Sequence, residues 1–563
     1  MRETKVLKRT RALKVQPARP ASPALGRRTA AKNAAAKSRS AAEKPIKKAP
    51  KPAAAPKPAV APVLLKPARF DSAAFGSHDE AAEAALRQCK AAWLSEADGE
   101  RARDRFCEAA ERSKRPALLI GASPALWVRE RARLAKLGFK ALHLDCAEGR
   151  VARSDVEALR RGGSLLVLVT PDVLGRTEVQ SALARVEFGS VGIDAAELAS
   201  EKSNEFRPAF ARLSQLLSGI PATSLFALAR PVPAEVRRDA QERLGLAQAA
   251  LVEAPLVAPG FRLDVRSVRG ERRNPTLLSL LPELPERGVI VCATPHEVDA
   301  VCAVIGAEHG SVCRIHAAMP PPDRAAMRDR FALASGRALL VTTSALAPDV
   351  GLPGLGETTA SEPRVGFGLD ALTEDVGFVL HHHAPASLEQ YLREVSTLRA
   401  PEALALLFYD SSHRSMNQAV LEQQRLPALK LEPFTRALEG ALASGKPVKH
   451  EALAFQIGVS RRTSERFIAL LVDAGVAQRE AAGISLQYTG LELAKHSSEL
   501  ARALETLQRG DLGRLASVER YAESADCKRR VLGDYFGEAT TANCGRCAAC
   551  RSGGAVERKI QAR

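Results

Sequence analysis

Short apolar runs that alternate with helical stretches constrain the fold of the middle of the chain most strongly. The runs lie at 117–122, 164–171, 288–295, 338–343 and 403–410, and amphipathic stretches such as 126–137 and 234–244 separate them. Strands alternating with helices form βαβ units around a parallel sheet. This pattern covers about 340 residues, more than the 100–200 of a usual domain. We therefore expect two α/β domains, at 67–268 and 269–414.

Four cysteines near the C-terminus have the spacing of a metal site. Cys527, Cys544, Cys547 and Cys550 follow Cys-x16-Cys-x2-Cys-x2-Cys, whereas the other six cysteines are scattered. Two-residue gaps let a tight turn, helped by Gly545, bring thiolates to one ion, and we expect Cys527 to join them from a preceding helix. Zinc takes four such ligands in a tetrahedron at about 2.3 Å. A chance cluster of buried thiols is the alternative; the spacing favours structural zinc.

The positive charge is concentrated at the N-terminus. The net charge is +18, and residues 1–60 hold 17 Lys and Arg against two Glu, a net of +15. Residues 1–66 are largely Ala, Pro, Lys and Arg, which cannot bury a core, so we expect a disordered tail. Such a tail binds nucleic-acid phosphates in a salt-dependent way. A solubilising tail and an organellar transit peptide are the alternatives. The sequence contains no run of about 18 apolar residues, so we predict no membrane span.

Residues 432–490 show a different pattern, in which two short helices precede a hairpin. The first helix ends near Gly458, and the second begins after Ser460 as its N-cap and stops at Gly475. Helix, turn, helix and hairpin are typical of a winged helix-turn-helix, which we place at 415–495.

The second helix of this unit has one polar and one apolar side. The apolar side, expected to pack inward, consists of Phe467, Leu470 and Leu471. The polar side, expected to face outward and bind DNA, consists of Arg461, Arg462, Thr463 and Arg466. Winged helices also serve as protein-contact modules, so a protein partner is the alternative at this surface.

The segment 527–550, CKRRVLGDYFGEATTANCGRCAAC, closely resembles the zinc-binding module of RecQ-family DNA helicases. The matching elements are the Cys-Arg-Arg start, Tyr535 to Glu538, and the final Cys-Gly-x-Cys-x-x-Cys. Upstream, NEFRPAF (204–210) resembles the element after the DEAH box of that family, and 378–395 resembles the approach to its last motif. The resemblance covers about 70–412 and 500–551. It implies two RecA-like domains, an inserted winged helix and a small helical zinc-binding module.

The family's nucleotide-handling positions carry unusual residues here. ATP hydrolysis needs a Gly-rich loop with Lys and Ser/Thr to hold phosphates and Mg²⁺, and residues 87–116 contain none. At the DEAH position, Asp194 remains as a possible magnesium ligand, but Ala195 replaces the Glu that polarises water. Arg399 is the one arginine kept from the last motif, and Asp79 aligns with the adenine-reading Gln.

The third motif of the family, usually Thr-Ala-Thr, reads Ala229-Arg230-Pro231 and has lost its hydroxyl groups. The zinc-binding module is expected at 496–563. The resemblance and these losses together predict a RecQ-like DNA-binding protein of the repair or recombination type that no longer hydrolyses ATP. Its cofactor is Zn²⁺, with ATP and Mg²⁺ binding in doubt.

The expected partner is DNA, bound through the tail and the winged helix, with repair or replication proteins as further partners. We expect the protein in the cytoplasm, associated with the nucleoid. Two alternatives remain: an active ATP-dependent 3'-5' DNA helicase with divergent motifs, and a regulatory protein-interaction scaffold.

Overall fold

The computed structural model describes residues 70–552 apart from several gaps. The gaps are 123, 145, 148–149, 162–165, 259, 307–309, 317, 344–375, 397, 399, 401, 445–447, 481–482 and 539–541. The predicted basic tail and Arg399 therefore lie outside the described residues.

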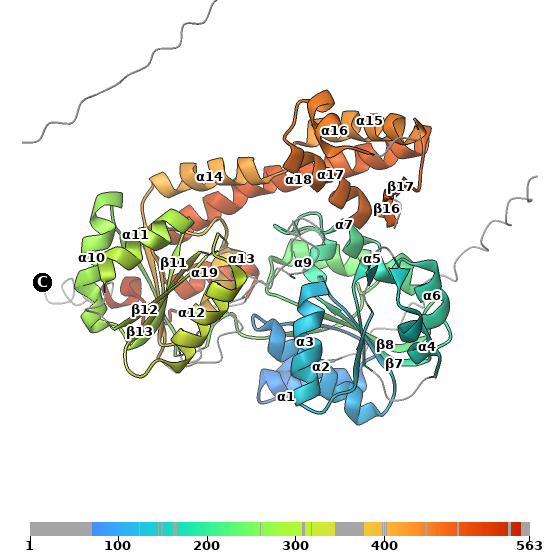
Figure 1. Cartoon of the computed structure of the whole chain (residues 1–563). Coiled ribbons are helices and arrows are strands. Elements are labelled where there is room, and N and C mark those ends of the chain that lie inside the picture. The colour runs from blue at the N-terminus through green and yellow to red at the C-terminus, as the bar shows by residue number, and fades with distance from the viewer. Residues whose placement is uncertain are drawn as a thin grey trace, which may run out of the picture. The chain divides into compact units, whose positions relative to one another are not determined.

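The first α/β domain is built around a seven-stranded parallel sheet (Figure 1) with the order β3-β6-β2-β7-β8-β1-β9. Its strands are β1 (Ala91–Ser95), β2 (Ala117–Ile120), β3 (Ala141–His143), β6 (Leu166–Val169), β7 (Phe188–Asp194), β8 (Ala222–Ala229) and β9 (Ala250–Glu253), and β4 (Cys146–Ala147) and β5 (Arg150–Val151) form a separate small ribbon. All residues of β2 and β6 are buried, as strands covered on both faces require.

Helices cover both faces of this sheet. One face packs against α1 (His78–Gln88), α2 (Gly99–Ser113) and α3 (Pro124–Lys136). The other face packs against α4 (Arg153–Arg161), α5 (Pro171–Leu174), α6 (Thr177–Leu183), η2 (Ala196–Ala199), α7 (Pro208–Ala211), α8 (Leu213–Leu217) and α9 (Ala234–Arg243). Strand residues alternate between the two cores: Leu118 and Ile120 join one, and Leu119 joins the other.

The second α/β domain contains a six-stranded parallel sheet with the order β10-β15-β14-β11-β13-β12. Its strands are β10 (Arg262–Ser267), β11 (Arg287–Cys292), β12 (Ser311–Ile315), β13 (Ala338–Thr343), β14 (Phe378–His381) and β15 (Leu404–Tyr409). The helices around it are α10 (Arg273–Leu280), α11 (Pro295–Ile305), α12 (Pro321–Leu333) and α13 (Leu388–Val395). Each of the five apolar runs forms a strand, so the prediction of two α/β domains is confirmed. The predicted boundary between 268 and 269 is wrong, because β10 pairs with β15 and so belongs to the second sheet.

Helices then lead into an inserted domain, which we define as residues 431–486. Before it come α14 (Ser412–Gln424) and η8 (Ala428–Lys430), and its elements are α15 (Leu431–Ala443), α16 (His450–Ile457), α17 (Arg461–Asp473), β16 (Ala477–Glu480) and β17 (Gly483–Leu486). The two strands pair antiparallel. Ser460 caps α17 by accepting a hydrogen bond from the Thr463 N–H, and Gly475 follows the helix at φ 68°. The helices, the cap and the hairpin are as predicted.

The helix α18 (Gly490–Glu523) runs without a break for 34 residues, across the predicted boundary between 495 and 496. Its start packs into the inserted domain through Leu493 and Leu504, and its end packs against the second sheet through Val518 and Tyr521. Helix α18 therefore contributes side chains to two hydrophobic cores, and for this reason it continues through the predicted boundary between 495 and 496. No helix among the described residues is long and apolar enough to cross a membrane.

Candidate metal centre and the edge of the first sheet

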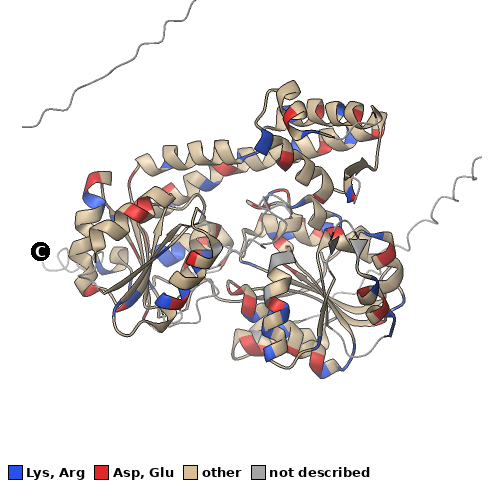
Figure 2. Cartoon of the chain, viewed as in Figure 1, with Lys and Arg blue, Asp and Glu red and all other residues tan. Residues whose placement is uncertain are grey.

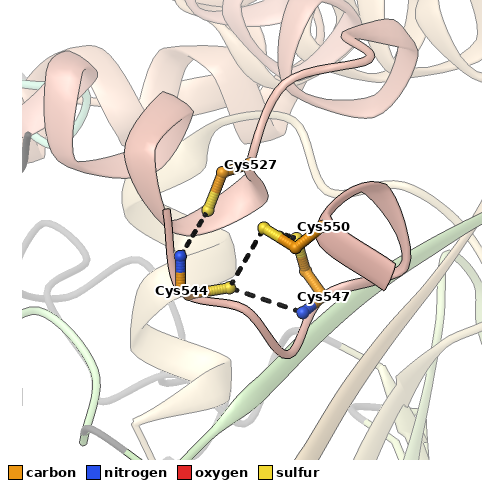
Figure 3. A group of neighbouring side chains, drawn as sticks. All are labelled: Cys527, Cys544, Cys547 and Cys550. Atoms are coloured by element: carbon orange, nitrogen blue, oxygen red, sulfur yellow. Dashed lines mark hydrogen bonds between the residues drawn. The ribbon is translucent and has the colours of Figure 1, made fainter. Parts of the chain in front are cut away.

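The four predicted cysteine ligands meet in one place (Figure 3), with their sulfur atoms all within 4.8 Å of one another. The Sγ atoms of Cys544 and Cys550 are 3.9 Å apart, and those of Cys547 and Cys550 are 3.4 Å apart. A tetrahedron of thiolates about 2.3 Å from zinc has edges of about 3.8 Å. The N–H of Cys544 donates to the sulfur of Cys527 at 3.2 Å. The residues present therefore fit a zinc ion held by the protein alone.

Cys527 is the N-cap of α19 (Lys528–Phe536), four residues beyond the end of α18. It therefore joins the site from the start of the helix that precedes the three clustered cysteines, as predicted. Lys528 fixes the turn between the two helices, because its Nζ donates to the carbonyl oxygens of Tyr521, Ala522 and Ser524. These carbonyls end α18 and would otherwise lack donors.

The surroundings of the four thiols differ. Burial favours the neutral thiol, but hydrogen bonds from the N–H groups of Cys544 and Arg530 lower the pKa of Cys527 to about 7. Burial raises the pKa of Cys550 to about 12. Four adjacent thiolates repel one another, so a divalent cation is what allows all four to ionise together.

The zinc-binding segment is anchored on the second α/β domain. Asp264 on β10 accepts a hydrogen bond from the Ala548 N–H at 2.7 Å and pairs with Arg551 at 3.1 Å. Leu532 and Phe536 of α19 belong to the same hydrophobic core as the second sheet. The metal therefore supports part of the core of that domain.

The first sheet has a strand–loop–helix unit at β1 and α2, the arrangement in which phosphate-binding loops occur. Here the loop between Ser95 and Gly99 is three residues long. Its last residue, Asp98, accepts hydrogen bonds at 3.1 Å from the N–H groups of both Glu100 and Arg101. These are donors of the kind that a phosphate binds at a helix N-terminus. A carboxylate of the chain already occupies them.

The carboxylate of Asp194, at the end of β7, is paired with an arginine. Arg103 Nη1 lies 3.2 Å from Asp194 Oδ2, and Arg103 Nη2 lies 3.6 Å from Glu130. All three side chains are buried. The guanidinium therefore supplies the positive charge beside Asp194, where a magnesium ion would otherwise be needed.

More charged side chains fill the same edge of the sheet. Arg105 donates to Glu96 and to Asp79, each at 2.6 Å, and Arg101 pairs with Asp79 as well. Glu96 and Arg105 are buried. Asp79, which aligns with the adenine-reading position, thus binds arginines of α2. Figure 2 shows basic and acidic residues interspersed on the helices of the α/β domains.

Glu197 and Arg230 form a further pair near the edge. The Arg230 N–H donates to Glu197 Oε2 at 3.1 Å, and the Arg230 guanidinium lies 3.6 Å from Oε1. Burial raises the pKa of Glu197 to about 7, against the opposing effect of Arg230. The cavity that these residues line with Glu205 and Arg393 has a volume of about 20 Å³. That is room for roughly one water molecule, whereas ligand pockets usually have about 300–1,000 Å³.

The residues predicted to bind DNA are only partly available. Arg461 and Arg462 are exposed at the start of α17, and Arg461 pairs with Glu451 at 2.8 Å. The Thr463 hydroxyl lies 2.9 Å from that of Ser460 and belongs to the cap. Arg466 donates to the carbonyl oxygen of Gln424. Arg466 is half-buried, so it is less available than Arg461 and Arg462, and its contact with DNA stays a prediction.

A second group of possible metal ligands consists of Cys292, Glu297 and His382. Glu297 Oε1 lies 2.7 Å from His382 Nδ1 and 3.1 Å from Arg273 Nη1. The guanidinium supplies positive charge to this carboxylate, so hydrogen bonds and an ion pair account for the arrangement, and we assign no metal to it.

The chain thus combines two parallel-sheet α/β domains with a four-cysteine module. Residues 493–551 match the family model described as RecQ zinc-binding. The ATP-dependent DNA helicase Q-like 5 of Arabidopsis thaliana is 25% identical over 269 residues, which is 46% of this chain and 27% of that protein. The ATP-dependent DNA helicase RecQ of Pasteurella multocida is 21% identical over 330 residues, 57% of this chain and 48% of that protein.

The probable ATP-dependent DNA helicase RecS of Bacillus subtilis is 20% identical over 374 residues, 66% of this chain and 67% of that protein. Among solved structures, the DUF1998 helicase MrfA bound to DNA has a TM-score of 0.46 at 12% identity, over 74% of this chain and 61% of that one. The chain spans from about a quarter to a half of the length of the first two relatives. The chain is thus similar to RecQ-family helicases in its zinc-binding segment and, at low identity, over about half of its length.

Proposed function

We propose that this chain is a RecQ-family pseudohelicase: a DNA-binding protein that keeps the two-domain motor architecture and the zinc module but does not bind or hydrolyse ATP. The observation that carries the proposal is that two side chains of the chain lie where an ATP site would hold the phosphate anion and the metal cation. Asp98 takes the helix N-terminus that would hold phosphate, and Arg103 takes the place of the cation beside Asp194.

ATP binding would have to disrupt these pairs. Moving Arg103 away would leave the buried carboxylate of Asp194 without this ion pair, whereas Glu130 would keep Arg133 at 2.7 Å. Removing one partner of a buried pair costs about 3–5 kcal/mol. A triphosphate would also meet the negative charge of Asp98 at a point where it needs N–H donors.

Hydrolysis would also lack a group to activate water. The residue after Asp194 is Ala195, at φ 56°, and its methyl group has no proton to exchange. Glu197 is the nearest carboxylate along the chain, but it is bound to Arg230. The three requirements of phosphate binding, metal binding and water activation are therefore unmet in one place.

DNA binding is the part of the function that the proposal retains. The curated relatives are described as DNA helicases, and the inserted domain presents Arg461 and Arg462 at the start of α17. A winged-helix role for that domain, phosphate contacts by the basic tail, and a cytoplasmic, nucleoid-associated location in DNA repair or recombination belong to the same proposal.

An ATP-dependent helicase with divergent motifs is the competing function, supported by the names of the relatives. Steady-state ATP hydrolysis with and without single-stranded DNA separates the two. We expect no DNA-stimulated turnover and no difference between the natural chain and Asp194→Ala. Stimulated turnover that the Asp194→Ala substitution abolishes would reject the pseudohelicase.

A regulatory protein scaffold that does not contact DNA through its folded part is the other alternative. Deleting residues 1–66 tests it. We expect the shortened chain to bind DNA more weakly, with a smaller dependence on salt, but still measurably. Complete loss of binding would assign all DNA affinity to the tail.

A further inference from the structure

The inserted domain carries an aromatic side chain that is almost entirely exposed. Phe455, on α16, is 90% exposed, and it is the one aromatic residue among the exposed large apolar side chains of the described part of the chain. Its neighbours Leu453 and Ala454 are 3% and 4% exposed. Helix α16 therefore buries one face in the domain core and points Phe455 away from it.

A single exposed apolar side chain is common on protein surfaces, so the surroundings of Phe455 decide its meaning. The helix ends two residues later at Ile457, where Lys430 Nζ donates to the carbonyl oxygen at 3.0 Å. The turn then passes through Gly458, at φ 69°, to the start of α17 with Arg461 and Arg462. An aromatic ring thus lies on the last turn of one helix, next to the turn that leads to exposed arginines.

The charges of this surface favour an anionic partner. Arg461 is balanced by Glu451 and Glu465, at 2.8 and 2.9 Å. Arg462 forms no ion pair within 4 Å among the described residues, and it is exposed. Lys430 is also exposed. Unbalanced cations beside an exposed ring are the combination by which proteins bind single strands, because the cations hold phosphates and the ring stacks on a base.

We propose that Phe455 stacks on an unpaired base of single-stranded DNA, while Arg462 and Lys430 bind the flanking phosphates. Duplex DNA hides the faces of its bases except at its ends, so the exposed ring selects single strands. This inference rests on the proposed DNA binding and names the residue and the form of DNA involved.

The chain offers a clean spectroscopic test, because its only two tryptophans, Trp93 and Trp127, are both fully buried in the first domain. Phe455→Trp adds an exposed indole at the proposed contact. The matched control is Leu491→Trp, at the start of α18, because Leu491 is also 90% exposed. Both substitutions lie on the surface, so both variants are expected to fold.

Each full-length variant is titrated with oligo-dT while the anisotropy of a labelled oligonucleotide reports binding separately. We expect the emission of the Phe455→Trp variant to be quenched as the DNA saturates, and that of the Leu491→Trp variant to stay unchanged. Saturation by anisotropy without quenching at 455, or equal quenching in both variants, overturns the stacking. Absence of any anisotropy change overturns the DNA-binding function itself, and the stacking with it.

Affinity gives a second measurement. Base stacking contributes about 1–3 kcal/mol, so Phe455→Ala should weaken single-strand binding by about 5- to 150-fold. Leu491→Ala should leave it unchanged. The titration is run at elevated salt, where phosphate contacts of the tail contribute less. An unchanged affinity in the Phe455→Ala variant would reject the proposal and favour a protein partner at this surface.

Discussion

One buried ion pair joins the inserted domain to the first α/β domain. The Arg207 guanidinium binds Asp473, with Nε 3.1 and 3.2 Å from the two carboxylate oxygens, and the Ala209 N–H donates to Oδ2 at 3.1 Å. The side chains of Arg207 and Asp473 are 3% and 0% exposed. Replacing Asp473 with Ala would leave a buried guanidinium without its counter-charge, at a cost of about 3–5 kcal/mol.

That cost is measurable by native-state hydrogen exchange of the peptides that contain α17 and α7. If the domains separate by local opening, a loss of about 3–5 kcal/mol accelerates exchange by about 10²- to 10⁴-fold, since each 1.4 kcal/mol is tenfold. The matched control is Asp299→Ala. Asp299 pairs with Arg314 at 2.7 Å on the surface, where both side chains are about half exposed, and such a pair contributes at most about 1 kcal/mol.

A double variant, Arg207→Leu with Asp473→Leu, checks the reason for the effect. Replacing both members of a buried pair with apolar residues is often close to neutral, so slow exchange should largely return. The buried pair would not have the assigned role if Asp473→Ala accelerated hydrogen exchange no more than Asp299→Ala does. The same holds if the double variant exchanged as fast as Asp473→Ala.

Three further predictions concern the zinc site, a buried carboxyl group and a glycine. Cys550→Ala should release the zinc, measured as metal per chain, and destabilise the second α/β domain, because a complete structural zinc site contributes on the order of 10 kcal/mol; unchanged zinc content would contradict this. Burial raises the pKa of Glu197 to about 7, so its stabilising contribution is full below its unfolded value of about 4.5 and is lost as the pH rises through about 7. The melting temperature should therefore fall between about pH 4.5 and 7, and Glu197→Gln should remove that part of the slope; an equal slope in both proteins would contradict this. Gly475→Ala should lower the melting temperature, because Gly475 has φ 68°, whereas Gly440→Ala should not, because Gly440 lies in α15 without a positive φ and with nothing within 4 Å of the added Cβ; an equal fall in both variants would contradict this.

Local signals in the sequence predicted the elements and the metal site. The five apolar runs became strands because a buried strand needs only its own apolar residues. The Ser460 cap and the cysteine site were also predictable from the sequence, because each depends on residues that are near one another in the chain.

Contacts between distant segments were not predictable in the same way. Arg103 meets Asp194 across 91 positions, and Arg466 meets Gln424 across 42. The sequence cannot show whether an arginine such as Arg466 faces DNA or a backbone carbonyl. Only the packing of α14 against α17 shows that Arg466 donates to the carbonyl oxygen of Gln424. The sequence showed that residues 87–116 contain no Gly-rich loop with Lys and Ser/Thr, but it did not show the contacts that Asp98 and Arg103 make.

The proposed loss of ATP binding requires that Asp98 and Arg103 occupy the positions of the phosphate and the cation in an ATP site. Equilibrium binding of ATP to the full-length protein, measured by calorimetry with Mg²⁺ and with single-stranded DNA present, tests it most directly. We expect no saturable binding up to millimolar nucleotide. Saturable, Mg²⁺-dependent binding that weakens in Asp194→Ala would contradict it.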